Sequence, residues 1–562
     1  MQAIALSGAN APGTSNGITF AQFPPAPFTP IGVPPSINAQ GHVDFYGTLI
    51  GQGVFSGLND QGLWSGTPGN VSLVARIDNS HFTPAVTFSS FAPTNASTPL
   101  PLMPVPINAN NQLAFDAFST GTGISIFNDE GLWTGTATNI SKFAAEGGQV
   151  PGQAPGVQYS QSTVSSFGSP YLNDAGHVAY MTSMTLVGTA LLAGDPSAPQ
   201  VVAQLGQQAP GVGPGITFAP QATFGSQPIT FSPVAFGAND QVTFTAGLQG
   251  PGVNFAFGGI WSGTPGNINL VARIGDQAPG MASGVTLQSQ TFGTPFANID
   301  ANGAGQVVFA SDAVNQSLSS TGSGLWTGTA GHVSLVAAGG AQAPGMPNGT
   351  NFSLDAFSNY PTNSALIGPL VNAQGQVAFS AYVDKPGSPI PMHSGGGIWA
   401  GLPGHLNLIA QIGQQAPVAP LSNLTFMSFS PNLPTPYPTL AMNDAGQVAF
   451  TATLSDNSTG IFGTDRAGQL REIVRPGDTI QVAPGDFRTV LGISFLGGSG
   501  NADGRPDGLS DNGQVAFWAV YSGGGSGIFV SNALAVPEPS SLLLVATGAL
   551  GLLIAARRRR SK

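Results

Sequence analysis

One motif recurs along the body of this chain and sets what it can fold into. An asparagine or a close substitute is followed by a glycine three residues later and by an aromatic residue seven residues later. The aromatic anchors are separated by 64 to 71 residues and define eight units: Phe45, Phe115, Tyr180, Phe244, Phe309, Phe379, Phe450 and Phe517. A period of this length indicates stacked copies of one small structural unit.

Each unit consists of tight turns and short strands. Asn443 can cap its own backbone and Gly446 accepts a positive φ, so residues 443–446 predict a turn that leads into a strand at 447–452. Further along the unit, a Gly-x-Trp strand, a turn and an apolar strand follow, as at residues 259–273, and a Gly/Pro-rich loop closes it. The sequence therefore predicts about four strands and no helix per unit.

These units predict an all-β fold. A single four-stranded sheet cannot bury both faces, so eight units favour a β-propeller of eight four-stranded blades over residues 1–532. The eighth unit ends at 527–530 without its apolar strand, whereas residues 3–13 match that strand and its loop. We expect the N-terminal strand to complete the last blade. Because that strand begins near Met1, we also expect an export signal upstream of it.

Composition excludes several classes of function. Charged residues make up 7% of the chain and hydrophobic residues 41%, the opposite of a disordered chain. Five of the 14 basic residues lie in the last six positions, which leaves nine against 24 acidic residues before Pro537, since one acidic residue, Glu538, follows it. Nucleic acid is therefore not an expected partner. The absence of cysteine removes disulfides, thiolate catalysis and cysteine metal sites.

The C-terminal segment is predicted to be a membrane anchor. A linker over 533–541 carries Pro537, Glu538 and Pro539, and a predicted transmembrane segment over 542–556 precedes a basic cytoplasmic tail over 557–562. As a helix, the 15 residues of this apolar segment would be about 22 Å long, whereas the hydrocarbon core of a bilayer is roughly 30 Å thick. The flanking serines and arginines can extend the length that spans the membrane. The anchor residues are Leu542, Leu543, Leu544, Leu550, Leu552, Leu553, Ile554, Arg557, Arg558, Arg559 and Arg560. A buried core helix is the alternative, which the four arginines disfavour.

The order Pro-Glu-Pro, apolar run, arginine cluster resembles the PEP-CTERM sorting signal of exopolysaccharide-producing, mostly Gram-negative bacteria. This resemblance implies an exported protein that an exosortase, a membrane protease-transpeptidase, processes near the motif before it is retained at or released from the surface. Pro537, Glu538 and Pro539 would then be recognition residues without a catalytic role. The repeats also resemble a class of bacterial surface proteins with tandem Asn-x-x-Gly-x-Ala-Phe repeats, which implies no activity.

Few residues of the sequence are candidates for catalysis. Four histidines occupy repeated turn positions and two others, His81 and His393, lie in loops without metal-ligand spacing; the four are His42, His177, His332 and His405. The Gly-x-Ser-x-Gly match at residues 13–17 lacks the strand-to-helix context of a reactive serine. The body has only three glutamates, Glu130, Glu146 and Glu472, and no carboxylate pair stands out.

One acidic loop departs from its repeat. Asp503, Asp507 and Asp511 lie among glycines, and closely spaced carboxylates with glycine turns can wrap Ca²⁺. The spacing is not that of an EF-hand, and Arg505 works against a cation. A polar loop is favoured, with a calcium site as the alternative.

We therefore predict a non-enzymatic surface or extracellular-matrix protein, a propeller that presents loops to exopolysaccharide or to other cells. The alternative is a secreted polysaccharide-acting enzyme with its site on one propeller face. A third possibility, a calcium-tuned spacer, depends on the loop from Asp503 to Asp511. The first is favoured because no unit shows a clustered set of His, Asp and Glu residues that its siblings lack.

Overall fold

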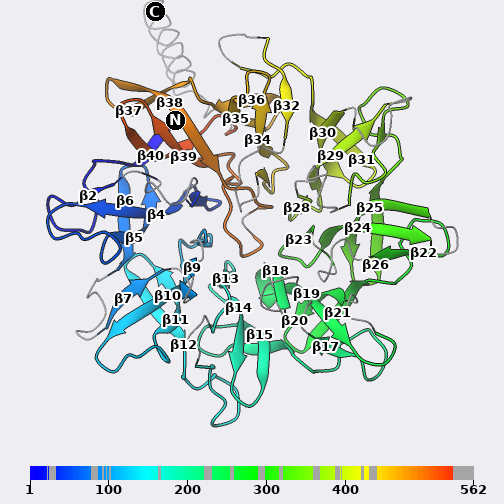
Figure 1. The fold of residues 1–562 in the computed structure, drawn as a ribbon, viewed down its shortest axis with the longest axis horizontal. Coiled ribbons are helices and arrows are strands. Elements are labelled where there is room, and N and C mark those ends of the chain that lie inside the picture. Colours follow the sequence, from blue (N-terminus) through cyan, green and yellow to red (C-terminus); the bar gives the residue numbers. More distant parts are fainter. Residues whose placement is uncertain are drawn as a thin grey trace, which may run out of the picture.

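The computed structural model shows eight β-sheets arranged around a central axis (Figure 1). It describes residues 1–535 with internal gaps, and the expected anchor at 542–556, the basic tail at 557–562 and the Pro-Glu-Pro motif lie outside the described residues. The gaps fall at 22, 24–32, 78–85, 92–93, 96–97, 100–102, 162–165, 220–230, 254–257, 289–295, 297, 316–319, 359–367, 386–392, 394, 419–422, 430–438 and 501.

The first four blades share one plan. One or two short strands pair with one side of a long strand, and two further strands continue the sheet on its other side. Blade 1 contains β2 (Thr19–Phe20), β3 (Ser36–Ile37), β4 (Val43–Ile50), β5 (Gln61–Thr67) and β6 (Asn70–Arg76). Blade 2 contains β7 (Val86–Ser90), β10 (Leu113–Gly121), β11 (Glu130–Thr136) and β12 (Asn139–Ala145), with a separate pair, β8 (Thr94–Asn95) and β9 (Thr98–Pro99). Blade 3 contains β13 (Tyr171–Leu172), β14 (Val178–Met184), β15 (Gly188–Gly194) and β16 (Gln200–Gln204). Blade 4 contains β17 (Thr217–Ala219), β18 (Phe231–Phe236), the 3₁₀ turn η1 (Ala238–Asp240), β19 (Val242–Gln249), β20 (Gly258–Thr264) and β21 (Asn267–Arg273).

The remaining blades repeat this plan, and the last one adds a long hairpin. Blade 5 contains β22 (Val285–Gln288), β23 (Ile299–Ala301), β24 (Val307–Asn315), β25 (Ser320–Thr329) and β26 (His332–Ala338). Blade 6 contains β27 (Asn351–Phe352), β28 (Leu370–Val371), β29 (Val377–Asp384), β30 (Gly395–Leu402) and β31 (His405–Gln411). Blade 7 contains β32 (Phe426–Ser428), β33 (Leu440–Met442), β34 (Val448–Leu454), β35 (Thr459–Thr464) and β36 (Leu470–Val474). Blade 8 contains β37 (Thr479–Ala483), β38 (Asp486–Phe495), β39 (Val515–Tyr521) and β40 (Gly525–Ser531).

The N-terminal strand closes the ring, as predicted. β1 (Gln2–Leu6) pairs antiparallel with β40, so that Ala3 lies opposite Phe529 and Leu6 opposite Gly527. The eighth sheet thus joins the two ends of the described chain (Figure 1). This pairing confirms an all-β propeller of eight blades.

The repeated aromatic residues form the core between blades. Trp64, Trp261, Trp326 and Trp399 are fully buried. In blade 4, the anchor Phe244 stacks on Trp261 with ring centroids 6.0 Å apart. The indole nitrogen of Trp261 also donates a 3.0 Å hydrogen bond to the carbonyl of Pro210, in the Gly/Pro loop that precedes the blade. Trp64, Trp326 and Trp399 make the same bond to Pro12, Pro279 and Pro344, so these four indoles also hold loops in place.

The turn asparagines connect neighbouring blades. Asn372 Oδ1 accepts hydrogen bonds from the amides of Gln374 and Gln376, which confirms the predicted self-capped turn. Its Nδ2 also donates a 3.0 Å bond to the carbonyl of Asn443, the same position in the next blade. The same bond to the next blade is made by Asn38, Asn108, Asn173, Asn302 and Asn443. The motif therefore stabilises the ring as well as the turn.

Within the described part of the chain, no helix is long and apolar enough to cross a membrane.

Candidate functional site

A loop of blade 8 fills the centre of the ring. Residues 497–500 and 502–508, here called the plug, lie between β38 and β39 and reach the axis (Figure 1). Backbone bonds join the plug to inner segments of several blades: Met442 donates to Gly498 O at 2.8 Å and Leu172 donates to Gly504 O at 3.1 Å. Further amides donate from Ile37 in blade 1 and Phe236 in blade 4. The plug is therefore held by edges that would otherwise be unpaired.

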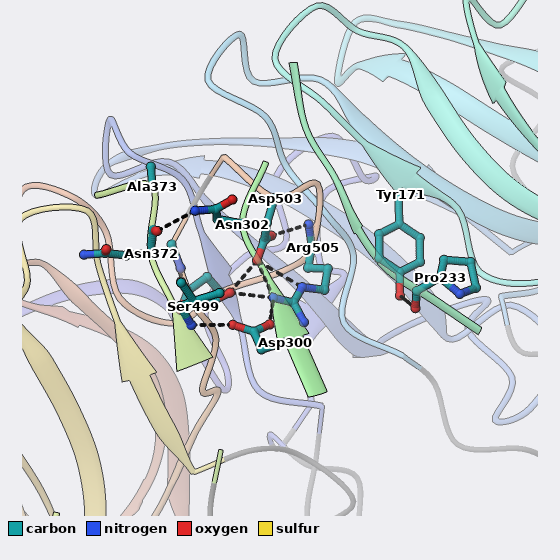
Figure 2. Close-up of polar contacts among 12 residues, drawn as sticks. Tyr171, Pro233, Asp300, Asn302, Asn372, Ala373, Ser499, Asp503 and Arg505 are labelled. Atoms are coloured by element: carbon teal, nitrogen blue, oxygen red, sulfur yellow. Dashed lines mark hydrogen bonds and ion pairs between the residues drawn. The ribbon is translucent and has the colours of Figure 1, made fainter. Parts of the chain in front are cut away.

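Arg505 anchors the plug from within (Figure 2). Its Nε donates to Asp503 Oδ2 at 3.0 Å, and its Nη2 contacts both Asp503 and the buried Asp300 of β23. Burial lowers the pKa of Arg505, but Asp300 and Asp503 outweigh it and raise that pKa well above its ordinary value. Burial also raises the pKa of Asp300, which Arg505 opposes. Asp300 Oδ2 accepts a 2.7 Å bond from Val371, so this cluster also connects blades 5 and 6.

The three carboxylates of the calcium candidate are held separately. Asp503 pairs with Arg505, and Asp507 accepts amide bonds from Gly500 and Leu509 at 2.9 and 3.1 Å. Burial raises the pKa of Asp507 to about 8. Asp511 accepts a 3.0 Å bond from the amide of Asp444 in blade 7. Among the described residues, no group of three or more His, Asp or Glu side chains is arranged to hold a metal ion.

A cavity of about 270 Å³ lies beside the plug, between it and blades 1, 2, 3 and 6. Its walls are mostly apolar, and Asp116 and Arg505 are the charged residues among them. The lining comprises Tyr46, Phe91, Met103, Pro104, Val105, Pro106, Ala114, Phe115, Asp116, Ser169, Pro170, Tyr171, Leu370, Leu496, Gly497, Gly498, Gly504, Arg505 and Pro506. A largely apolar hollow with a few polar groups is the usual form of a small-molecule site.

Asp116 belongs to a cluster of three carboxyl groups in blade 2. Asp116 lies on β10, Glu130 begins β11 and Glu146 follows β12, and both glutamates are buried. Ser166 ties the cluster to blade 3, because its hydroxyl donates a 2.6 Å bond to Glu146 Oε1 and its amide donates to Glu130 Oε2. The cluster therefore lies at the junction of blades 2 and 3, next to the cavity.

The surroundings of Asp116 favour its protonated form. Burial is the largest cause of a pKa raised well above the ordinary value, and the charge of Glu130 and that of Glu146 raise it further. Within the described residues, Asp116 Oδ1 has no hydrogen-bond partner. A protonated Asp116 can share its proton with Glu130.

This cluster corrects two sequence-based expectations, namely that no carboxylate pair stands out and that no unit shows a clustered set of His, Asp and Glu residues that its siblings lack. Blade 2 is such a unit. Glu130 occupies a position that is Gln61 in blade 1 and Gly258 in blade 4, and Glu146 occupies one that is Ile77 and Ile274. Aligning the repeats column by column would have revealed both departures.

The other candidate residues do not join this site. His177 Nδ1 lies 2.7 Å from Asp240 Oδ1 in the turn of the next blade, and His393 stacks on Tyr382 with centroids 4.3 Å apart. His42 is half-buried in its turn, whereas His332 and His405 begin outer strands and are exposed. Ser15, of the Gly-x-Ser-x-Gly match, is exposed at the start of a turn, and His81 lies outside the described residues.

Family models match the whole propeller and the tail. A model described as "Family of unknown function (DUF7453)" matches residues 1–289 and again residues 282–543, so that each match covers about four blades. A model of the PEP-CTERM protein-sorting motif matches residues 535–560 and confirms the predicted sorting signal. The resemblance to the tandem Asn-x-x-Gly-x-Ala-Phe class stays a prediction. No curated protein matches the chain.

Solved propellers share the general fold at low similarity. The propeller domain of the Trilobed protease from Pyrococcus furiosus, described as having an open velcro topology, is 9% identical with a TM-score of 0.35, over 78% of this chain and 96% of that one. An α-L-arabinanase from Penicillium chrysogenum is 10% identical with a TM-score of 0.22, over 64% and 91%. A lectin from Aleuria aurantia is 10% identical with a TM-score of 0.23, over 66% and 94%. At these values no ligand or reaction transfers to this chain.

Proposed function

Because this chain belongs to the family of unknown function DUF7453 and ends in a PEP-CTERM motif, we propose that it is an exported bacterial surface or matrix protein. Its propeller serves as a non-enzymatic binding or structural scaffold, and exopolysaccharide is the proposed partner of its loops. An exosortase-type enzyme processes the tail near Pro537, Glu538 and Pro539. Before processing, residues 542–556 hold the protein in the membrane.

The plug is the observation that supports a scaffold function. A propeller's central channel is a natural place for a ligand or reaction site, and here the plug occupies it. The charged groups at the axis bind one another, since Arg505 contacts both Asp300 and Asp503. These groups stabilise the ring, which suits a body whose role is to remain folded outside the cell.

Export and sorting can be tested in the producing bacterium. Full-length protein is compared with a variant in which Pro537, Glu538 and Pro539 are replaced by alanine. We expect the unaltered protein outside the cell in a shortened form and the variant retained at full length. Identical location and mass for the two proteins would overturn the sorting proposal.

A second candidate function is a secreted enzyme that acts on polysaccharide. It is favoured by one observation, the carboxyl cluster of Asp116, Glu130 and Glu146 beside the cavity. A protonated carboxyl group next to an ionised one is the pairing that glycoside hydrolysis uses. Shortening of polysaccharide by the purified protein, lost in Asp116→Asn, would favour this candidate over the scaffold.

A further inference from the structure

The cavity beside the plug has one wall of contiguous aromatic rings. The rings of Tyr46 and Phe91 lie 5.8 Å apart between centroids, and those of Phe91 and Phe115 lie 6.1 Å apart. All three side chains line the cavity. A flat apolar molecule can pack against such a wall, because aromatic rings attract one another in stacked and edge-to-face arrangements.

Two polar side chains of the lining are already engaged within the protein. The hydroxyl of Tyr171 donates a 2.8 Å bond to the carbonyl of Pro233 (Figure 2). Asp116 is hydrogen-bonded to Glu130, and its Oδ1 is fully buried. Neither side chain therefore presents an open charge or an uncommitted proton to a ligand.

Arg505, in contrast, keeps one donor group. Its Nε and Nη2 atoms are used by Asp503, Asp300 and Ser499 (Figure 2). Its Nη1 makes no hydrogen bond to any described residue and is not among the fully buried polar atoms. Since the cavity is the open space that Arg505 lines, Nη1 can donate to an oxygen acceptor in it.

The charges around the cavity favour an uncharged ligand. The positive charge of Arg505 is balanced by Asp300 and Asp503, and the body carries an excess of acidic residues, so an anion gains little here. A cation finds no open carboxylate in the lining, because Asp116 is held by Glu130. Placing either charge against mostly apolar walls costs free energy.

We propose that this cavity binds an uncharged aromatic molecule with one oxygen acceptor, whose ring packs against Tyr46 and Phe91 and whose oxygen accepts a hydrogen bond from Arg505 Nη1. Apolar walls with one placed polar group are the usual form of such a site. The proposal does not depend on the export or scaffold function. It assigns a ligand class to a site that the family models leave without one.

The test uses four probes of similar shape. Acetophenone is uncharged and carries one carbonyl oxygen, benzoate is an anion, α-methylbenzylamine is a cation, and ethylbenzene is uncharged and has no oxygen. Binding of each to the purified full-length protein is measured by titration calorimetry at pH 7.5. We expect acetophenone to bind about tenfold or more tightly than either charged probe and roughly three- to tenfold more tightly than ethylbenzene.

Three results would overturn the proposal. The first is no binding of acetophenone at millimolar concentration. The second is binding of benzoate or α-methylbenzylamine that is as tight as that of acetophenone, because the site would then recognise a charge. The third is equal binding of ethylbenzene, which would mean that Arg505 Nη1 does not bind the ligand.

Matched variants locate the site. Ser169 is an exposed residue of the lining, so Ser169→Trp places a large ring in the cavity and should weaken acetophenone binding about tenfold or more. Ser56→Trp, the same change at an exposed loop position of blade 1 outside the lining, should leave binding unchanged. Tyr46→Leu removes an aromatic wall and should weaken binding as well. Thermal melts check that each variant is folded. Equal losses in Ser169→Trp and Ser56→Trp would contradict a site at the cavity.

Discussion

The side-chain amide of Asn38 donates a 2.9 Å hydrogen bond to the main-chain carbonyl of Asn108, its counterpart in the next blade. Both residues are buried. Because six turn asparagines make this bond, the motif that repeats along the sequence is also the contact that joins blade to blade around the ring.

Replacing one turn asparagine should weaken the whole ring. Asn372→Ala removes the bond to Asn443 O and the acceptor for two turn amides, leaving buried polar groups without partners. We expect a loss of roughly 2–4 kcal/mol in the free energy of unfolding. Urea denaturation measures it, with Asn407→Ala, at an exposed position of the same blade, as the control. Equal effects of the two changes would contradict the inter-blade role.

The plug should depend on Arg505. Arg505→Met leaves the buried Asp300 and Asp503 without their counter-charge, so we expect a loss of about 3–5 kcal/mol. Arg471→Met removes an exposed ion pair with Asp465 and should cost no more than about 1 kcal/mol. The two variants are compared by their urea midpoints. Similar urea midpoints for Arg505→Met and Arg471→Met would mean that the ion pairs of Arg505 do not stabilise the propeller.

One buried carboxyl group should be dispensable. Asp44 is 2% exposed, and burial raises its pKa well above the ordinary value, with only Ser65 opposing. The same position is alanine in five other blades, Ala114 among them. Asp44→Ala should therefore raise stability at pH 8 by about 1–3 kcal/mol and by less at pH 5, where the carboxyl group is protonated. Thermal melts at both pH values check this, and a loss at pH 8 would contradict it.

The propeller should become more stable as the pH falls from 8 to 5. Burial raises the pKa of Asp507 to about 8 and that of Asp444 to about 6, whereas an unfolded aspartate titrates near 3.9. Between those values the folded state binds more protons than the unfolded state, so stability falls as the pH rises through this window. We expect a higher melting temperature at pH 5 than at pH 8, and a smaller difference in Asp507→Asn. A lower melting temperature at pH 5 would contradict this sign.

The fold was predictable because its signals are local and repeated. The Asn-x-x-Gly turn, the Gly-x-Trp strand and the split last blade each follow from adjacent residues, so the propeller and its closure by β1 could be derived. The inter-blade bond of Asn372 could not, because a side chain that caps its own turn gives no sign of a second partner.

The Arg505 ion pairs and the Asp116 carboxyl cluster are formed by contacts between residues far apart in the sequence. The sequence did not predict them for that reason. Arg505 and Asp300 are 205 positions apart in the sequence, and their pairing follows only from the path of the plug across the axis. Glu130 and Glu146 were detectable, since they interrupt columns that hold neutral residues in the sibling blades. Their convergence with Asp116 required the pairing of β10 with β11 and of β11 with β12.

The proposed scaffold function requires that the propeller bind polysaccharide without cleaving it. The most direct test incubates the purified protein with extracellular polysaccharide from the producing bacterium and measures retention and chain length in the same sample. We expect the polysaccharide to be retained with its chain length unchanged. Shortening that disappears in Asp116→Asn would contradict it and would make the carboxyl cluster beside the plug an active site.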